Sequence, residues 1–167
     1  MPDEPAPKQA APPAPAEPPQ PPAAPAEVPA DLGSADGAPA KILVADDVAL
    51  MRNLLLRALV KAGYVVFEAN DGKQALELVS RERPDLIVLD SMMPVLSGPE
   101  CLKILKTTPN TKNIPVIMCT ARSEKPDVLE SKELGADDYI VKPFKIETVL
   151  ERVAKHLPPE KRGSTRK

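Results

Sequence analysis

The sequence contains few of the residues that build disulfides and most metal centres. Its 167 residues include two cysteines, Cys101 and Cys119, and a single histidine, His156. No short metal-type spacing links these three residues, so we expect no sulfur-ligated metal. Scarce cysteine is typical of a reducing compartment, and we expect a cytoplasmic protein without disulfides. His156 lies near the end of the last expected helix, where we expect it to face solvent or the helix dipole.

Long apolar runs and basic stripes are also missing. No apolar segment approaches the roughly 18 residues needed to cross a bilayer, and the N-terminus lacks the apolar core of a signal peptide. No stripe of Lys and Arg runs through the central part of the chain, so the electrostatic footprint of nucleic-acid binding is absent. We therefore expect neither membrane insertion nor nucleic-acid binding.

Proline is abundant but unevenly distributed. Residues 1–40 hold 13 of the 22 prolines, many alanines and few large apolar residues. Such a segment buries too little apolar surface to offset the entropy lost on ordering. We expect a disordered Pro/Ala-rich tail at residues 1–39, one folded domain at residues 40–158 and a short basic tail at residues 159–167.

The sequence between residues 40 and 158 alternates between strand and helix patterns. Short apolar runs are typical of strands buried on both faces, and apolar residues at three- and four-residue steps are typical of amphipathic helices. This alternation predicts an α/β fold, a wound parallel sheet with helices on both faces. The expected strands are 41–45, 64–68, 86–90, 114–119 and 138–141, and the expected helices are 48–62, 71–81, 98–106, 125–134 and 145–157.

Polar side chains stand where the expected strands end. They are Asp46 and Asp47 after the first strand, Asp90 at the end of the third, Thr120 after the fourth and Lys142 after the fifth. Because the carboxyl ends of parallel strands meet at one edge of a sheet, we expect these side chains to converge. Three clustered carboxylates repel one another unless a cation joins them, and an open set of oxygen ligands suits Mg²⁺.

This arrangement favours phosphoryl transfer to a carboxylate. Aspartate can attack phosphorus and form an acyl phosphate, and Asp90 is the candidate nucleophile. Mg²⁺ held by Asp46 and Asp47 would polarise phosphoryl oxygens, while Lys142 would neutralise another oxygen. The Thr120 hydroxyl could donate a hydrogen bond to a third oxygen. Any one of these residues alone would be interpreted as a capping, turn or surface residue, so the prediction depends on their joint placement.

The chain resembles a bacterial two-component response regulator, specifically a stand-alone receiver domain of the chemotaxis type, over about residues 40–158. The motifs that carry the resemblance are Asp46-Asp47, Asp90 with Pro94 and Gly98, Thr120-Ala121, and Lys142-Pro143-Phe144. The resemblance implies a flavodoxin-like receiver fold with strand order 2-1-3-4-5, an order for which the chemotaxis receiver is a standard example. It also implies a cis peptide bond before Pro143.

The resemblance further implies a role for each site residue. Asp90 would be the phosphoacceptor, with Thr120 and Lys142 as contacts of the phosphoryl group. Asp47, Asp90 and the Met92 backbone carbonyl would ligate Mg²⁺ directly, and Asp46 would act largely through water. No other cofactor and no catalysis beyond the protein's own phosphorylation and dephosphorylation are implied.

The resemblance also implies a signalling surface and a source of phosphate. Tyr139 would turn inward as Thr120 moves toward the phosphoryl group, which alters the surface formed by residues 125–134 and 138–157. A histidine kinase or histidine phosphotransfer protein would supply the phosphoryl group in a phosphorelay. Only ten residues follow Leu157, so we expect the output to be contact with a downstream protein.

The first helix offers a candidate docking face for that phosphodonor. Leu54, Leu55 and Leu56 are consecutive, and a helix cannot turn all three toward one core. We expect Leu54 and Leu55 to face inward together with Ala58. The outward, partner-binding face would then carry Val48, Ala49, Arg52 and Leu56.

Alternative functions remain open at this stage. The chain could be a scaffold or localisation protein that acts through its Pro-rich tail, or a phosphate sink or relay intermediate. A phosphatase of the haloacid dehalogenase type needs a second carboxylate two residues after its nucleophile, where this chain has Met92. A dinucleotide-binding dehydrogenase would need GxGxxG after the first strand, and that motif is missing.

Overall fold

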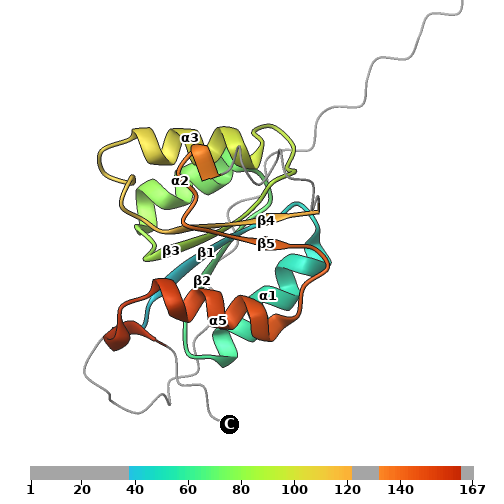
Figure 1. The fold of residues 1–167 in the computed structure, drawn as a ribbon, viewed down its shortest axis with the longest axis vertical. Helices are drawn as coiled ribbons and strands as arrows, with labels where there is room; N and C mark the ends of the chain where they lie inside the picture. Colours follow the sequence, from blue (N-terminus) through green and yellow to red (C-terminus); the bar gives the residue numbers. More distant parts are fainter. Residues whose placement is uncertain (1–37, 122–131, 163–167) are drawn as a thin grey trace, which may run out of the picture.

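The computed structural model describes residues 38–121 and 132–162, which form a parallel sheet covered by helices on both faces (Figure 1). The sheet has five strands in the order β2-β1-β3-β4-β5, and every neighbouring pair is parallel. The expected fold class and strand order are therefore confirmed. The strands are β1 (Lys41–Ala45), β2 (Val65–Ala69), β3 (Leu86–Asp90), β4 (Val116–Thr120) and β5 (Asp138–Val141).

Within residues 38–121 and 132–162, two helices lie on each face of the sheet (Figure 1). Most of the expected helix at 125–134 falls on residues 122–131 and so lies outside the described residues. None of the helices in the described ranges has the length and hydropathy of a membrane span. The helices are α1 (Ala49–Lys61) and α5 (Ile146–His156) on one face and α2 (Gly72–Glu82) and α3 (Gly98–Thr107) on the other, followed by a short 3₁₀ helix, η1 (Pro159–Lys161).

The alternation of side chains along the central strands divides the core in two. Leu86 and Val88 of β3 pack in the cluster under α1 and α5, whereas Ile87 and Leu89 pack under α2 and α3. Every residue of β3 is buried, as the continuous apolar run predicts. Burying one such aliphatic side chain contributes about 1.5–3 kcal/mol to the free energy of folding. A register shift of one residue would move every side chain of β3 to the opposite face of the sheet.

The expected orientation of α1 is wrong at three positions, Arg52, Leu54 and Leu56. Leu54 is exposed, whereas Leu56 is partly buried and packs against the core shared by α1 and α5. The buried stripe follows the spacing i, i+3, i+4, i+7 from Arg52 through Leu55 and Leu56 to Leu59. Arg52 therefore also lies toward the body of the domain, and neither Arg52 nor Leu56 has the outward position that the sequence suggested.

The chain after β3 turns closely around the end of that strand. A Cβ atom on Gly98 would collide with the backbone carbonyl of Asp90 and would lie 2.8 Å from the Cα of Ser91. Glycine therefore permits the N-terminus of α3 to approach the end of β3. In the same loop, Val95 has a φ of 69°, a left-handed conformation that is unusual for a β-branched residue.

The folded part of the chain extends beyond Leu157. Lys161 in η1 forms an ion pair with Asp85, with 2.6 Å between Nζ and Oδ1, and the Lys41 backbone amide donates to the other carboxylate oxygen of Asp85. This contact fixes η1 near the start of β1, at the end of the sheet opposite the carboxyl ends of the strands.

His156 does not face solvent or the helix dipole, contrary to expectation. Its Nε2 lies 2.9 Å from Oδ2 of Asp138, a buried carboxylate at the start of β5. Arg152 Nη1 lies 2.7 Å from Oδ1 of the same carboxylate, and the Tyr139 amide also donates to it. Although burial alone would raise the pKa of Asp138, the hydrogen bonds from His156 and Arg152 outweigh it and lower the pKa to about 2.

This cluster predicts a specific dependence of stability on pH. A carboxyl whose pKa is lower in the folded state stabilises the fold above its unfolded pKa, and the contribution is lost as the pH falls through the folded pKa. The shift in the pKa of Asp138 from 3.8 to about 2 corresponds to about 2 kcal/mol. We expect Asp138→Asn to lower the free energy of unfolding by about that amount near pH 5, and the difference from wild type to shrink toward about pH 2.5.

Urea denaturation across this pH range measures the effect. Glu147→Gln, at an exposed position of α5, is the matched control, and we expect it to change stability by less than about 0.5 kcal/mol. A difference between Asp138→Asn and wild type that stayed constant with pH would show that packing, and not charge, holds β5 to α5.

Candidate functional site

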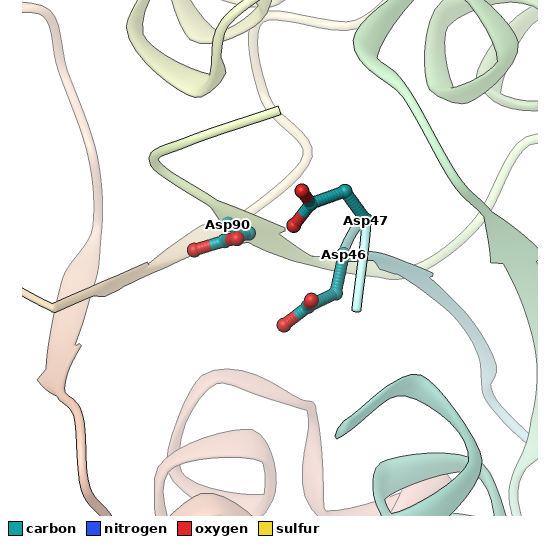
Figure 2. Close-up of side chains that lie close together, drawn as sticks. All are labelled: Asp46, Asp47 and Asp90. Carbon is teal, nitrogen blue, oxygen red and sulfur yellow. The ribbon is translucent and has the colours of Figure 1, made fainter. Parts of the chain in front are cut away.

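Three carboxylates meet at the carboxyl ends of the two central strands (Figure 2). Asp46 and Asp47 directly follow β1, and Asp90 is the last residue of β3. These strands are neighbours, with Ala45 paired to Leu89. One oxygen from each carboxylate lies within 4.8 Å of the others. The convergence expected from the sequence therefore occurs, although Asp46 and Asp90 are buried whereas Asp47 is exposed.

Lys142 supplies a positive charge to this cluster. Its Nζ lies 3.0 Å from Oδ2 of Asp46 and 3.1 Å from Oδ1 of Asp90. Lys142 follows β5, and its backbone amide donates to the carbonyl of Thr120 at 2.7 Å. The peptide bond between Lys142 and Pro143 is cis, as expected.

The charged groups of the cluster shift one another's pKa values. Burial raises the pKa of the Asp90 carboxyl, and the charges of Asp46 and Asp47 act in the same direction, whereas Lys142 opposes them. Burial alone would lower the pKa of Lys142, but its hydrogen bond to Asp46 and the charge of Asp90 outweigh it and raise the pKa. Lys142 is therefore held as an ammonium beside Asp90.

The carboxylate cluster has the chemistry of a divalent-cation site. Its donor atoms are all carboxylate oxygens, which hard cations such as Mg²⁺ prefer, and the exposure of Asp47 leaves the cluster accessible to water. In the part of the chain that the structure describes, the ammonium of Lys142 forms ion pairs with two of the three carboxylates, so a further cation would relieve the remaining repulsion. Asp46, Asp47 and Asp90 thus fit a magnesium ion.

The other expected site residues lie around this cluster. Thr120 is buried at the end of β4, next to β3 in the sheet. Met92 lies two residues beyond Asp90 with an exposed side chain, and Tyr139 in β5 is 43% exposed. The metal contact of the Met92 carbonyl and the switch roles of Thr120 and Tyr139 stay predictions.

Within the described residues, neither cysteine thiol forms a hydrogen bond with a residue of the acidic cluster. Both are free and buried, and they lie in the two different core clusters on opposite faces of the sheet. Burial raises the pKa of each thiol to about 12, so neither forms a thiolate near neutral pH.

Sequence inspection missed the contacts of Arg52. Its Nη1 donates to the backbone carbonyl of Asp46 at 2.8 Å, and its Nε lies 3.4 Å from Oε1 of Glu68 in β2. The expected partner-binding role rested on an outward orientation, and these contacts contradict that orientation. The helical spacing from Arg52 to Leu55, Leu56 and Leu59 was the available signal.

Comparison with known proteins places this site in a family. Residues 42–154 match the response regulator receiver domain family. Sporulation initiation phosphotransferase F of Bacillus subtilis (strain 168) is 45% identical over 118 residues, which are 71% of this chain and 94% of that protein. Response regulator MprA of Mycobacterium leprae is 43% identical over 113 residues, or 68% of this chain, and this chain spans 49% of its length.

Solved structures show the same relationship. Chemotaxis protein CheY4 of Vibrio cholerae superposes on this chain with a TM-score of 0.69 and is 36% identical to it. The superposition covers 72% of this chain and 100% of the CheY4 chain. The receiver domain of sensor histidine kinase PA1611 from Pseudomonas aeruginosa PAO1 has a TM-score of 0.66 at 29% identity and covers 71% of this chain and 97% of its own. That structure holds a magnesium ion coordinated in its active-site cleft.

The family match covers most of the described residues, and the carboxylate cluster, Lys142 and Thr120 lie within it. This chain therefore belongs to the response regulator receiver domain family.

Proposed function

We propose that this protein is a phosphoryl-accepting switch of a two-component phosphorelay, phosphorylated on Asp90 in a Mg²⁺-dependent reaction. The observation that carries the proposal is the position of Asp90, which shares an acidic cluster with Asp46 and Asp47 and contacts Lys142. A Mg²⁺ ion bound by these carboxylates supplies charge neutralisation to the incoming phosphoryl group.

The residues of the chain perform the remaining steps. An Asp90 oxygen forms a bond to phosphorus while the bond from phosphorus to the donor breaks, which leaves an acyl phosphate and the released donor. Lys142, already 3.1 Å from Asp90, neutralises a phosphoryl oxygen, and Thr120 donates a hydrogen bond to another. Attack of water on phosphorus restores the carboxylate and releases inorganic phosphate, so the protein catalyses only its own phosphorylation and dephosphorylation.

The phosphorylated protein acts through contacts with other proteins. Tyr139, exposed on β5, and Thr120 at the end of β4 form the switch that reports phosphorylation to the surface. A second candidate function is a relay step in which Asp90 passes its phosphoryl group to another protein. The similarity to sporulation initiation phosphotransferase F, of which this chain covers 94%, favours that candidate.

The phosphodonor is a histidine kinase or a histidine phosphotransfer protein that docks on α1. Val48, the N-cap residue of α1, and Leu50 and Leu54, one helical turn apart in α1, are exposed by 47%, 79% and 47%. Large exposed apolar side chains that gather beside a site are typical of protein interfaces. The proposed docking face therefore comprises Val48, Ala49, Leu50 and Leu54, with Leu50 and Leu54 in place of Arg52 and Leu56.

Phosphorylation by a small molecule tests the switch. We expect incubation with acetyl phosphate and Mg²⁺ to add the mass of one phosphoryl group, and hydroxylamine to remove it, because an acyl phosphate is labile to that nucleophile. Intact mass spectrometry measures both steps. The control variant Asp90→Asn and a sample with excess chelator should show no addition. Failure of folded wild type to be phosphorylated by acetyl phosphate and by active kinases alike would contradict the proposal.

Comparing phosphorylation by a kinase with phosphorylation by acetyl phosphate tests the docking face, because only the kinase must dock on it. We expect Leu50→Asp combined with Leu54→Asp to slow phosphotransfer from a cognate kinase about tenfold or more, because loss of exposed apolar anchors weakens an interface. Phosphorylation by acetyl phosphate should stay unchanged.

A matched control comes from the opposite face of the domain. Ile104 in α3 is also an exposed apolar residue, and Ile104→Asp should leave both rates unchanged. Equal slowing by the α1 and α3 substitutions would argue against docking on α1.

A further inference from the structure

Arg52 connects three elements beside the acidic cluster. It lies in the first turn of α1, where its amide donates to the carbonyl of Val48. Its guanidinium contacts the Asp46 carbonyl at the end of β1 and the Glu68 carboxylate in β2. The Arg52 and Glu68 side chains are only 19% and 20% exposed. A largely buried guanidinium that donates a hydrogen bond to one partner and forms an ion pair with another restrains both.

The Asp46 peptide group is the point at which this link acts on the site. The Asp46 amide donates to the carbonyl of Ala69 at 3.1 Å, and the Val48 amide donates to Oδ1 of Asp46 at 2.8 Å. Arg52 satisfies the remaining carbonyl. That carbonyl belongs to the planar peptide bond between Asp46 and Asp47, so its orientation sets the position of the Asp47 backbone nitrogen and Cα.

Asp47 depends on this backbone restraint more than the other two carboxylates do. Asp46 and Asp90 are held by Lys142. In the described part of the chain, by contrast, no hydrogen bond or ion pair involves the carboxylate of Asp47, which is exposed. Its placement within 4.8 Å of the other carboxylates therefore rests on the loop that Arg52 ties down.

We propose that Arg52, supported by Glu68, is a positioning residue that pre-organises Asp46 and Asp47 for Mg²⁺ binding through its contact with the Asp46 carbonyl. This inference rests on the proposed magnesium-dependent function and adds a residue that touches neither the metal nor the phosphoryl group. Mutation of residues that orient metal ligands typically costs about 10–100-fold in metal affinity or activity.

The direction in which Mg²⁺ affinity changes when Arg52 is replaced distinguishes a positioning role from a purely electrostatic one. Removing a positive charge near three carboxylates would by itself strengthen cation binding. We expect the opposite for Arg52→Met, a weakening of Mg²⁺ affinity by about tenfold. Arg57→Met removes the same charge from an exposed position of the same helix, and it should leave the affinity within about twofold of wild type because an exposed charge is screened.

Isothermal titration calorimetry with Mg²⁺ alone, performed on the full chain below its unfolding transition, measures these affinities. Arg52→Lys keeps the charge but lacks the planar fork that spans two acceptors, so we expect a loss between those of wild type and Arg52→Met. Affinity in Arg52→Met equal to or tighter than in Arg57→Met would overturn the proposal.

Amide hydrogen exchange without metal provides a readout that does not depend on Mg²⁺. We expect the Val48 amide, which donates to Asp46, to exchange faster in Arg52→Met than in Arg57→Met, while the amides within β3 exchange at equal rates. Uniformly faster exchange would indicate general destabilisation and would overturn the positioning role.

The two readouts distinguish the possible failures. Wild type that binds no Mg²⁺ would contradict the proposed function, and the exchange rates would still decide whether Arg52 holds the Asp46 peptide. Equal Mg²⁺ affinities of wild type and Arg52→Met would contradict only the role of Arg52.

Discussion

Electrostatic balance among three carboxylates and one ammonium is the constraint on which the site depends. Asp46, Asp47 and Asp90 lie together because β1 and β3 are neighbours, and their mutual repulsion opposes that arrangement. Lys142 reaches across from β5 to contact two of them, so the outer strand of the sheet is tied to its centre. In the proposed function, a bound cation and an arriving phosphoryl group would both change this balance and so would couple chemistry at Asp90 to the contacts of Lys142 after β5.

The fold supplies the rigidity that such a site needs. Each central strand is clamped between two packed clusters, one under α1 and α5 and one under α2 and α3. Gly98 permits the chain to turn closely beside Asp90, and Arg52 fixes the Asp46 carbonyl. At the far edge, Asp138 links β5 to Arg152 and His156 of α5. The Arg52 contact thus lies where a strand ends, whereas the Asp138 contacts lie where a strand begins.

Sequence alone predicted the features that follow from local pattern. The all-apolar run of β3 and the polar residues at the strand ends were sufficient for the sheet and its acidic cluster. Three consecutive leucines in α1 allowed two helix orientations, and the structure has the one in which Leu56 packs against the core shared by α1 and α5. The contacts of Arg52 and His156 join residues far apart in the sequence or across elements. Periodicity indicates which side of a helix is buried, but not which partner a side chain on that side contacts.

A crystal structure with Mg²⁺ and beryllofluoride, which mimics an aspartyl phosphate, tests the central claim most directly. We expect beryllofluoride on Asp90 in contact with Lys142 and Thr120, and Mg²⁺ ligated by Asp47, Asp90 and the Met92 carbonyl. The Arg52 guanidinium should keep its contact with the Asp46 carbonyl. Beryllofluoride bound to a different residue, or Mg²⁺ bound away from these carboxylates, would contradict the account.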